Sequence, residues 1–319
     1  SLGFNVFITD IKKNQIDYMK EKLFPSRYGK WDNKIVCLKY ENVFSNKKVF
    51  DLIIIGTSPL FHLDVLKKSF KKLKYKKILI EKPLSVYWQK IDFLKKNNKN
   101  LFCGFNHSIS PSILHVFEMI KKKKIGKIHY IKINWKEDFK LVLKAHPWIK
   151  SIKDSYLSDI KRGGGVLHEY SHALHLGLCL RNILFPKKNT KMSEKILFKK
   201  VSDYKYDSEA IIELKYKNIV IEINIDSTTN PPKKDLTIFG AEGKIYWKRN
   251  MKKSQENISL SKGRKILKNN FPISRPLDFI NQLKILLKKN NSSIKNITTI
   301  NSAIEVMEVI KSIFKKKYV

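Results

Sequence analysis

The sequence predicts a parallel α/β domain followed by an α+β domain with an open, mainly antiparallel sheet. In the first hundred residues, short apolar runs such as DLIII at 51–55 and KILI at 77–80 alternate with amphipathic helical patterns. This alternation is typical of a parallel sheet that is buried on both faces. Further along the chain, residues 219–226 alternate between apolar and polar side chains, which indicates a strand with one buried face. The 319 residues are enough for two domains, which we expect at 1–105 and 106–319.

The first domain is expected to begin with a strand that ends at Asp10. Apolar runs with β-branched residues mark its strands, and apolar residues at helical spacing mark its helices. The expected strands are 3–9, 34–38, 51–55, 77–80 and 101–105, and the expected helices are 14–23, 62–73 and 86–96.

The second domain begins with a helix at 111–122, which ends near Gly126, and a long strand at 127–136. Strand pairing is expected within 208–227 and in a hairpin formed by 234–239 and 244–248 around GAEG, and two helices follow at 276–289 and 299–315. An open sheet with one exposed face often pairs with a second copy of itself, so we expect a homo-oligomer formed through this sheet.

The net charge of +37 is the most extreme property of the composition. Only six of the 65 basic residues are arginines, the residue best suited to bidentate contacts with bases and phosphates. The lysines are also spread along the whole chain. We therefore interpret the charge as a solvated basic surface and expect no specific nucleic-acid partner.

No apolar run approaches the ~20 residues that a bilayer span requires, so we expect no membrane span. The opening SLGFNVFITD lacks a basic stretch and a cleavage site, which argues against a secretion signal. The three cysteines show no metal-type spacing and suit a reducing compartment. These features predict a cytoplasmic protein.

Three segments follow expected strands and carry residues suited to ligand binding. They are GTSP at 56–59, EKP at 81–83 and GFNHS at 104–108. Parallel α/β sheets bind ligands at the carboxyl ends of their strands, where these segments should meet. A fourth segment, RGGGVLHEYSHALHL at 162–176, has a glycine run that leads into a helix with Glu169 and His172.

With these four segments, the chain resembles the glucose-fructose oxidoreductase, inositol dehydrogenase and MocA family of NAD(P)-dependent sugar oxidoreductases over nearly its whole length. The resemblance implies a Rossmann-like first domain that binds NAD or NADP and a second domain that binds a sugar or nucleotide sugar. It further implies hydride transfer between a sugar carbon and the nicotinamide. No metal is implied.

The resemblance also implies roles for individual residues. Lys82 matches the family's catalytic lysine, and a lysine near a cationic nicotinamide is well placed to move a proton. His172 matches the usual histidine of the substrate domain, and Glu169 the acid before it. The cofactor would contact Asp10, Thr57, Ser58, Pro59, His62, Glu81, Lys82 and Asn106, and the substrate would contact Lys82, His168, His172 and His175.

Asp10 sits where a dinucleotide-binding domain presents an acid to the adenosine ribose, which favours NAD over NADP, although Lys12 and Lys13 weaken that preference. Asp10 can equally be a strand-end aspartate. None of the twelve glycines forms a G-x-G-x-x-G loop before it. We therefore expect the first strand and phosphate loop to be missing and NAD binding by these residues to be weak or absent. A micromolar dissociation constant in calorimetry would refute this expectation.

The chain departs from the family pattern in two places. The family spaces its acid and histidine four residues apart, whereas Glu169 and His172 are three apart, which on one helix rotates the histidine by about 100°. His168 and His175 therefore remain alternatives. The usual N-x-R-F sequence is replaced by Asn106, His107 and Ser108, so the substrate contacts there must differ.

Two other functions compete with the oxidoreductase. The sequence His168-Glu169-x-x-His172 matches the H-E-x-x-H pattern of zinc hydrolases, with Glu194 as a candidate third ligand. A non-catalytic sugar-binding or assembly partner with the same fold is the other alternative, because function depends on the site and not on the fold.

Overall fold

A computed structural model describes residues 3–96, 99–144, 146–147, 149–186, 193–200, 206–287 and 296–318. The chain forms two compact units, one of residues 1–53 with 64–77 and one of 54–63 with 78–319. The boundary expected between residues 105 and 106 divides the chain by ligand, into a cofactor domain and a substrate domain. The two compact units divide it by internal contacts and do not test that boundary, which stays a prediction.

The first unit contains two small parallel sheets. Strand β1 (Phe7–Ile8) pairs with β2 (Val36–Cys37), and β3 (Val49–Phe50) pairs with β5 (Lys74–Tyr75). The helix expected at 14–23 is longer, because α1 (Lys13–Tyr18) continues through a π-helical segment at Met19–Leu23 into α2 (Phe24–Tyr28). A short helix, α3 (Tyr40–Val43), follows β2.

A three-stranded sheet has the order β4 (Ile53–Ile55), β6 (Ile78–Ile80) and β7 (Leu101–Cys103). Every residue of β6 and β7 is buried, and the two strands run parallel, as their apolar sequences predict. A 3-10 turn (Pro59–Phe61) and α4 (His62–Lys72) follow β4. The loops after these strands are the segments 56–59, 81–83 and 104–108.

The helix expected at 86–96 is wrong for its first seven residues, since only α5 (Phe93–Lys96) is helical. Gln89 accounts for part of the difference, because its side-chain oxygen accepts from the Val86 amide at 3.0 Å and its nitrogen donates to the Leu60 carbonyl at 2.9 Å. Val86 and Ile91 are buried as predicted, but in a turn. Helical spacing of apolar residues therefore indicated burial correctly and conformation incorrectly.

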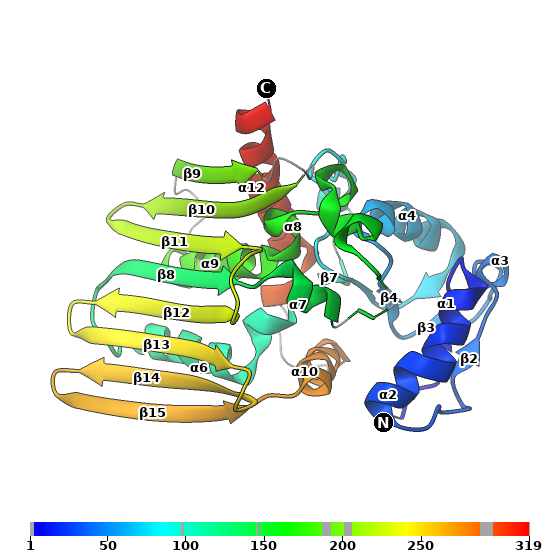
Figure 1. Ribbon diagram of the computed structural model, residues 1–319, viewed down its shortest axis with the longest axis horizontal. Helices are drawn as coiled ribbons and strands as arrows, with labels where there is room; N and C mark the ends of the chain where they lie inside the picture. The colour runs from blue at the N-terminus through cyan, green and yellow to red at the C-terminus, as the bar shows by residue number, and fades with distance from the viewer. Residues whose placement is uncertain are drawn as a thin grey trace. The chain divides into compact units, whose positions relative to one another are not determined.

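The second unit is built on an eight-stranded sheet with the order β15-β14-β13-β12-β8-β11-β10-β9 (Figure 1). Only β8 and β11 pair in parallel, and the other neighbours are antiparallel. This confirms the predicted open, mainly antiparallel sheet. The strands are β8 (Ile128–Lys136), β9 (Ser193–Lys200), β10 (Asp207–Tyr216), β11 (Ile219–Asp226), β12 (Lys233–Gly240), β13 (Gly243–Asn250), β14 (Gln255–Lys262) and β15 (Lys265–Pro272).

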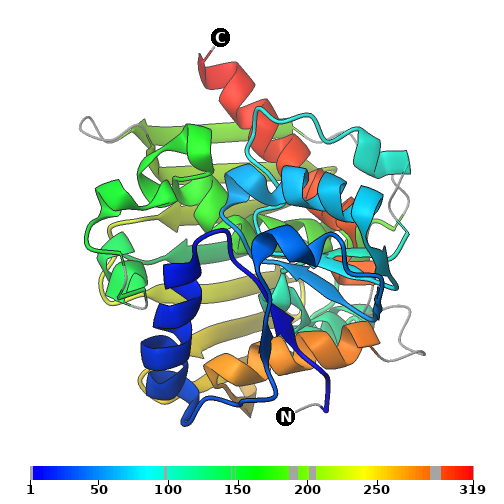
Figure 2. The same cartoon turned by 90° about the vertical axis from the view of Figure 1, so that its right-hand side faces the viewer.

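The alternation of β11 separates a buried face from a polar face. Ile221, Ile223 and Ile225 are at most 3% exposed, on the face covered by helices. On the other face, Glu222 accepts from the Tyr130 hydroxyl at 2.6 Å and pairs with Lys132 at 2.9 Å. Helices α6 (Pro111–Lys121) and α9 (Ser171–Leu184) pack on the buried face, and α12 (Ile300–Tyr318) packs on α9 (Figures 1 and 2).

Strands β14 and β15 were not anticipated, because β15 is exposed at seven of its eight residues and so lacks a period-two pattern. The remaining helical elements are α7 (Phe139–Lys144), α8 (Val166–Glu169), α10 (Arg275–Leu287) and 3-10 turns at Asn106–Ile109, Ile152–Asp154, Tyr156–Ser158, Ile160–Arg162 and Asn296–Thr298. No helix in the described ranges combines the length and apolar character needed to cross a membrane.

Candidate active site

Lys82 lies against the end of α8. Its Nζ is 3.0 Å from Glu169 Oε2 and donates to the Glu169 main-chain oxygen at 2.7 Å. The side chain of Lys82 is 15% exposed and that of Glu169 is 14% exposed. A lysine held by two acceptors has a fixed position, unlike the solvated lysines elsewhere. Lys82 of the E-K-P segment and Glu169 of the glycine-led helix, both assigned to the site from the sequence, are therefore in direct contact.

Tyr156 completes this contact, and the sequence gave no sign of it. Its hydroxyl donates to Glu169 Oε2 at 2.8 Å, the oxygen that pairs with Lys82. Burial, followed by the charge of Glu169, raises the pKa of Tyr156 well above its usual value, so the hydroxyl stays protonated and remains a donor. Glu169 thus holds a tyrosine and a lysine together.

The glycine run brings Tyr156 to Glu169. The amide of Gly164 donates to the Asp159 carbonyl at 2.9 Å, and that of Gly165 donates to the Leu157 carbonyl at 3.1 Å. A Cβ on Gly164 would lie 2.3 Å from the Tyr156 oxygen, so only glycine allows the two backbones to approach this closely. The glycine run therefore packs directly against the turn that carries Tyr156.

The acid and the histidine lie on separate helices, which changes the meaning of their spacing. Helix α8 ends at Glu169, Tyr170 leaves the helical conformation with φ −97 and ψ 26, and α9 begins at Ser171. The 100° rotation expected for one continuous helix therefore does not apply. Glu169 contacts Lys82 while His172, on the first turn of α9, faces a different set of residues.

His172 lies in a cage of rings. The ring centroid of His107 is 4.5 Å away and nearly perpendicular, that of Phe105 is 5.8 Å away, and that of Trp135 is stacked at 5.9 Å. The side chain is 8% exposed, and its Nδ1 has no hydrogen-bond partner among the described residues. Burial, followed by the charges of His107 and Lys82, lowers the pKa of His172 well below its usual value. The imidazole is therefore neutral, and its Nδ1 is a buried nitrogen without a partner among the described residues.

His107 is held by an arginine from the large sheet. Arg249 on β13 donates to His107 Nδ1 at 2.9 Å, and it also pairs with Glu256 at 2.8 Å and with Asp278 at 2.9 Å. Because arginine only donates, His107 is the tautomer with its hydrogen on Nε2. Burial and then Arg249 lower the pKa of His107 well below its usual value. The segment in which the family motif would place an arginine thus receives one from β13.

A second lysine borders the ring cage. Lys234 on β12 pairs with Glu137 at 2.7 Å, and its Nζ lies 5.4 Å from the centre of the Trp135 ring. Trp135, Lys234, Arg249 and His107 were not among the predicted site residues. They come from β8, β12, β13 and the turn after β7, and only the fold brings them to His172.

His168 and His175 are fully buried and hydrogen-bonded. His168 Nδ1 lies 3.0 Å from the Gly164 oxygen, and its Nε2 accepts from the Tyr87 amide at 3.2 Å. His175 Nδ1 lies 2.7 Å from Ser108 Oγ, and its Nε2 lies 3.0 Å from the Ile297 oxygen. Burial lowers the pKa of His168 to about 4 and that of His175 to about 3. Of the three histidines, His172 fits the acid–base role best.

The same contacts bear on the zinc hypothesis. Both His168 nitrogens are used within the protein, so this residue has no free lone pair for a metal. The side chain of Glu194 lies outside the described residues. Over the described ranges, no group of three or more His, Cys, Asp or Glu side chains is arranged to hold a metal ion.

Apart from Asp10, the predicted cofactor residues follow the carboxyl ends of β4, β6 and β7. The Glu81 amide donates to the Ile55 carbonyl at 2.9 Å, and the Gly104 amide donates to the Ile80 carbonyl at 2.8 Å, which aligns the three loops. A Cβ on Gly104 would lie 2.6 Å from Glu81 Oε2, so this glycine makes room for the carboxylate. Thr57 is exposed, Ser58 is half-buried, and Asn106 and Pro59 are buried.

His62 ties two of these loops together. Its Nε2 lies 2.8 Å from the Thr57 oxygen and its Nδ1 2.9 Å from the Pro83 oxygen, and the side chain is 1% exposed. His62 therefore positions the residues around it. Its direct contact with a cofactor stays a prediction, as do those of the other residues assigned from sequence.

Asp10 belongs to the first unit. The carboxylate is exposed, and Oδ1 accepts from the Lys12 amide at 2.8 Å just before α1. This is the turn contact expected of a strand-end aspartate. Its proposed contact with an adenosine ribose stays a prediction.

Asp207 anchors the glycine-led helix from β10. Its Oδ2 accepts from the Leu167 amide at 2.8 Å, its Oδ1 has no partner among the described residues, and the side chain is fully buried. A Cβ on Gly165, whose φ is +82, would lie 1.8 Å from Oδ1. Burial raises the pKa of Asp207 to about 7 from 3.8.

This raised pKa predicts a loss of stability as the solution becomes less acidic. Folding favours the protonated form of Asp207. The resulting contribution to the free energy of unfolding is complete below the pKa of 3.8 that Asp207 has in the unfolded chain, and it is lost as the pH rises through about 7. A shift of this size corresponds to roughly 4 kcal/mol. We expect thermal unfolding of Asp207→Asn to vary less between pH 5 and pH 8 than that of the unaltered protein. Equal pH dependence in both would show that another group is responsible.

The fold and this cluster together define a class of protein, in which a parallel α/β sheet is followed by a large open sheet that carries helices on one face. Solved structures with the same fold include a 3-ketoreductase, a dehydrogenase and an aldose-aldose oxidoreductase. The 3-ketoreductase KijD10 from Actinomadura kijaniata, in complex with NADP and TDP-benzene, matches 95% of this chain and 86% of its own at 11% identity, with a TM-score of 0.68.

Two further structures match at least as well. Levoglucosan dehydrogenase in complex with NADH and L-sorbose matches 98% of this chain and 87% of its own at 12% identity, with a TM-score of 0.73. The aldose-aldose oxidoreductase from Caulobacter crescentus, complexed with glycerol, matches 97% and 88% at 12% identity, with a TM-score of 0.72. No family model and no curated protein matches the sequence. At these identities the matches establish a shared fold.

Proposed function

We propose that the protein is an NAD(P)-dependent oxidoreductase that transfers a hydride between the nicotinamide and a sugar or nucleotide-sugar carbon that bears a hydroxyl. The observation that carries this proposal is the fixed contact of Lys82 with Glu169, three residues before His172. The contact lies in a fold shared with sugar oxidoreductases. KijD10 is in complex with NADP and TDP-benzene, and levoglucosan dehydrogenase is in complex with NADH and L-sorbose, which supports both the cofactor and the substrate class.

His172 and Lys82 would each interact with the hydroxyl group of the sugar. The lowered pKa leaves His172 neutral, so its imidazole can accept the hydroxyl proton as the sugar is oxidised. The Lys82 ammonium has hydrogens beyond those it gives to Glu169 and can donate one to the same oxygen, which stabilises the negative charge that develops there. Tyr156 and Glu169 hold Lys82 in that position.

The nicotinamide end of the cofactor fits the strand-end loops. Thr57 and Ser58 present a partly exposed surface, and Glu81 and Lys82 follow the neighbouring strand. When bound, the nicotinamide supplies the group that accepts or donates the hydride. Asp10 would favour NAD over NADP if it meets the adenosine ribose. The sequence contains no G-x-G-x-x-G loop for the pyrophosphate.

A hydride-transfer screen tests the proposal. The protein is incubated with sugars and nucleotide sugars and with NAD or NADP, and the absorbance of reduced nicotinamide is followed. Oxidised nicotinamide mononucleotide is included as a second hydride acceptor, because it carries the reacting ring without a dinucleotide pyrophosphate. We expect turnover with at least one sugar and its loss in His172→Ala. Calorimetric binding of a sugar with no turnover under any condition would favour the non-catalytic partner.

A further inference from the structure

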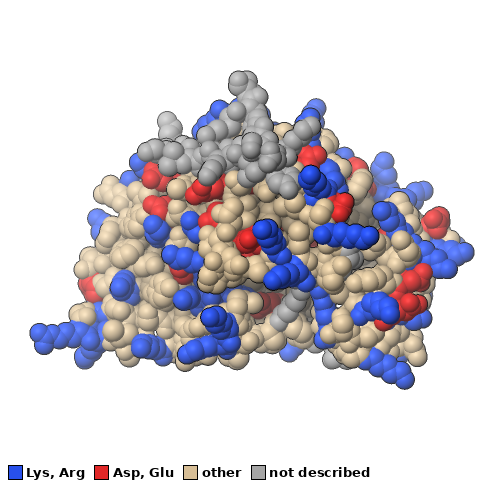
Figure 3. Space-filling model, in the orientation of Figure 1, with Lys and Arg blue, Asp and Glu red and all other residues tan. Residues whose placement is uncertain are grey.

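The edge of the large sheet formed by β15 carries a hollow of about 590 Å³, which is lined by five lysines and two leucines. The lysines come from the turn after α6 and from the β14–β15 hairpin. The proposed reaction does not use this surface. Figure 3 shows Lys and Arg side chains projecting at the end of the sheet where this hairpin turns in Figure 1. We call it the basic hairpin surface; it consists of Lys122, Lys123, Lys124, Leu260, Lys262, Arg264, Lys265, Ile266 and Leu267.

Aliphatic side chains stand among these charges. Ile266 is 59% exposed and Leu267 is 63% exposed, and the two stand between Lys265 and Lys268 in the chain. Leu267 pairs across the hairpin with Leu260, and Ile266 pairs with Ser261, so the two exposed residues point to opposite faces of the strand. The tip of the hairpin therefore presents an aliphatic side chain on each face, surrounded by cations.

The lysines after α6 are held by their backbone. The Lys124 amide donates to the Met119 carbonyl at 3.1 Å and the Lys123 amide to the Ile120 carbonyl at 2.9 Å, which is a Schellman ending. Lys123 has φ 51, a conformation that favours glycine. Three consecutive lysine side chains therefore extend from this turn. Two acidic groups lie among the lysines of the surface: a hydrogen bond from Lys121 and, further, the charge of Lys122 lower the pKa of Glu118, and Glu242 pairs with Lys262 at 2.6 Å.

The exposed side chains of the basic hairpin surface favour an anionic lipid surface over a single-stranded nucleic acid as its partner. Single-stranded nucleic acids are bound by cations together with aromatic side chains on which bases stack. The exposed apolar residues here are isoleucine and leucine, which cannot stack in that way but do partition into the interface of a bilayer. Cations near an anionic lipid surface each add to the binding, and aliphatic side chains add a contribution that salt does not screen.

We propose that the basic hairpin surface docks the protein reversibly on a membrane rich in anionic phospholipid. The hairpin enters the headgroup region edge-on through Ile266 and Leu267, and the lysines of the hairpin and of the α6 turn pair with lipid phosphates. The surface is separate from Lys82 and His172, so docking does not depend on the proposed reaction.

Vesicle co-sedimentation tests the proposal. Vesicles of equal parts phosphatidylglycerol and phosphatidylcholine should bind the protein, and pure phosphatidylcholine should not. The variant Lys122→Gln/Lys123→Gly/Lys124→Gln should bind about 100-fold more weakly. Because Lys123→Gly relieves a positive φ, this variant should fold at least as stably, which thermal unfolding checks. Ile266→Ser and Leu267→Ser should remove the binding that persists in high salt.

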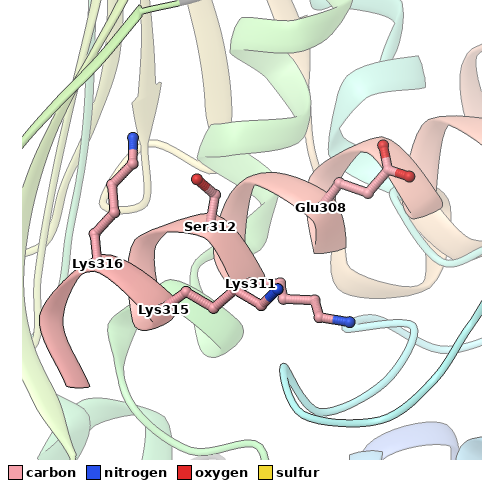
Figure 4. Close-up of a pocket in the computed structure, with 5 residues that line it drawn as sticks. All are labelled: Glu308, Lys311, Ser312, Lys315 and Lys316. Atoms are coloured by element: carbon pink, nitrogen blue, oxygen red, sulfur yellow. The ribbon is translucent and has the colours of Figure 1, made fainter. Parts of the chain in front are cut away.

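The matched control lies on α12. Lys311, Lys315 and Lys316 line another hollow, of about 420 Å³, together with Glu308 and Ser312 (Figure 4). Figure 4 shows Lys316 directed away from Lys311. Replacing these three lysines with glutamine removes the same charge and should change vesicle binding only a few-fold. An equal loss in both triple variants would overturn the proposal, and so would tighter binding to a single-stranded RNA that is unaffected by Leu267→Ser.

Discussion

Replacing Lys82 with methionine is expected to lower kcat/KM for hydride transfer by roughly 10²- to 10⁴-fold. Methionine keeps most of the length and apolar volume of the lysine stem but removes the three ammonium hydrogens. The 2.7 Å and 3.0 Å contacts with Glu169 disappear, and no cation remains to donate to the sugar oxygen. The measurement is initial velocity against sugar concentration, at the cofactor concentration that gives the highest rate in the unaltered protein.

The same variant has a readout that does not depend on turnover. The charge of Lys82 is one of the causes that lower the pKa of His172, because a neighbouring cation disfavours the imidazolium. Its removal should therefore raise the pKa of His172, which NMR titration of the ring protons can follow. An unchanged His172 titration, with activity near that of the unaltered protein, would show that the two residues do not share a site.

Lys90→Met is the matched control for this experiment. Lys90 is exposed and lies eight residues further along the chain. The substitution removes the same charge and adds the same side chain without touching Glu169. We expect kcat/KM to change less than about twofold, since exposed surface substitutions have small effects. A similar loss in both variants would point to the overall charge of the protein as the cause.

The sequence predicted the strand-end segments well because their signals are local. Buried strands in a parallel sheet are short, continuous apolar runs, and the residues after them must lie at one edge. Glu81 and Lys82 could therefore be placed next to residues 56–59 without coordinates. Lys82 and Glu169 were both assigned to the site from resemblance to a family, but their contact with each other was not predicted.

The second half of the site could not be predicted in this way. Tyr156, Trp135 and Arg249 lie on elements far apart in the chain, and nothing in their local sequence marks them. Their positions depend on the register of the large sheet, and β14, which supplies Glu256 to Arg249, has only two apolar residues to mark it as a strand. A single helix over 166–176 was also assumed, whereas Tyr170 divides it into two.

His107 shows how a departure from a motif can be informative. The sequence places His107 where the resemblance leads one to expect a motif with arginine, and substrate contacts were expected to differ there. In the structure, Arg249 reaches this position from β13 and binds His107, which packs against His172. The guanidinium therefore acts through a histidine, and it is already neutralised by Glu256 and Asp278.

Gly164→Ala should strongly destabilise the protein, because the added methyl group would meet main-chain atoms. Its Cβ would lie 2.3 Å from the Tyr156 oxygen and 2.5 Å from the Leu157 oxygen, and both are backbone atoms that cannot rotate away. The turn at Tyr156–Ser158 would have to move, at a cost of about 3 kcal/mol or more. Thermal and urea unfolding measure this loss.

Gly56→Ala separates this steric effect from a general effect of replacing glycine. The nearest heavy atom to a Cβ at Gly56 is Glu81 Cγ at 3.9 Å, an ordinary contact, so stability should change by less than about 1 kcal/mol. In Gly164→Ala, movement of the turn should also break the 2.8 Å hydrogen bond from Tyr156 to Glu169, so activity should fall even where the protein is still folded. If folded Gly164→Ala kept full activity, Tyr156 would not be needed to position Lys82 through Glu169.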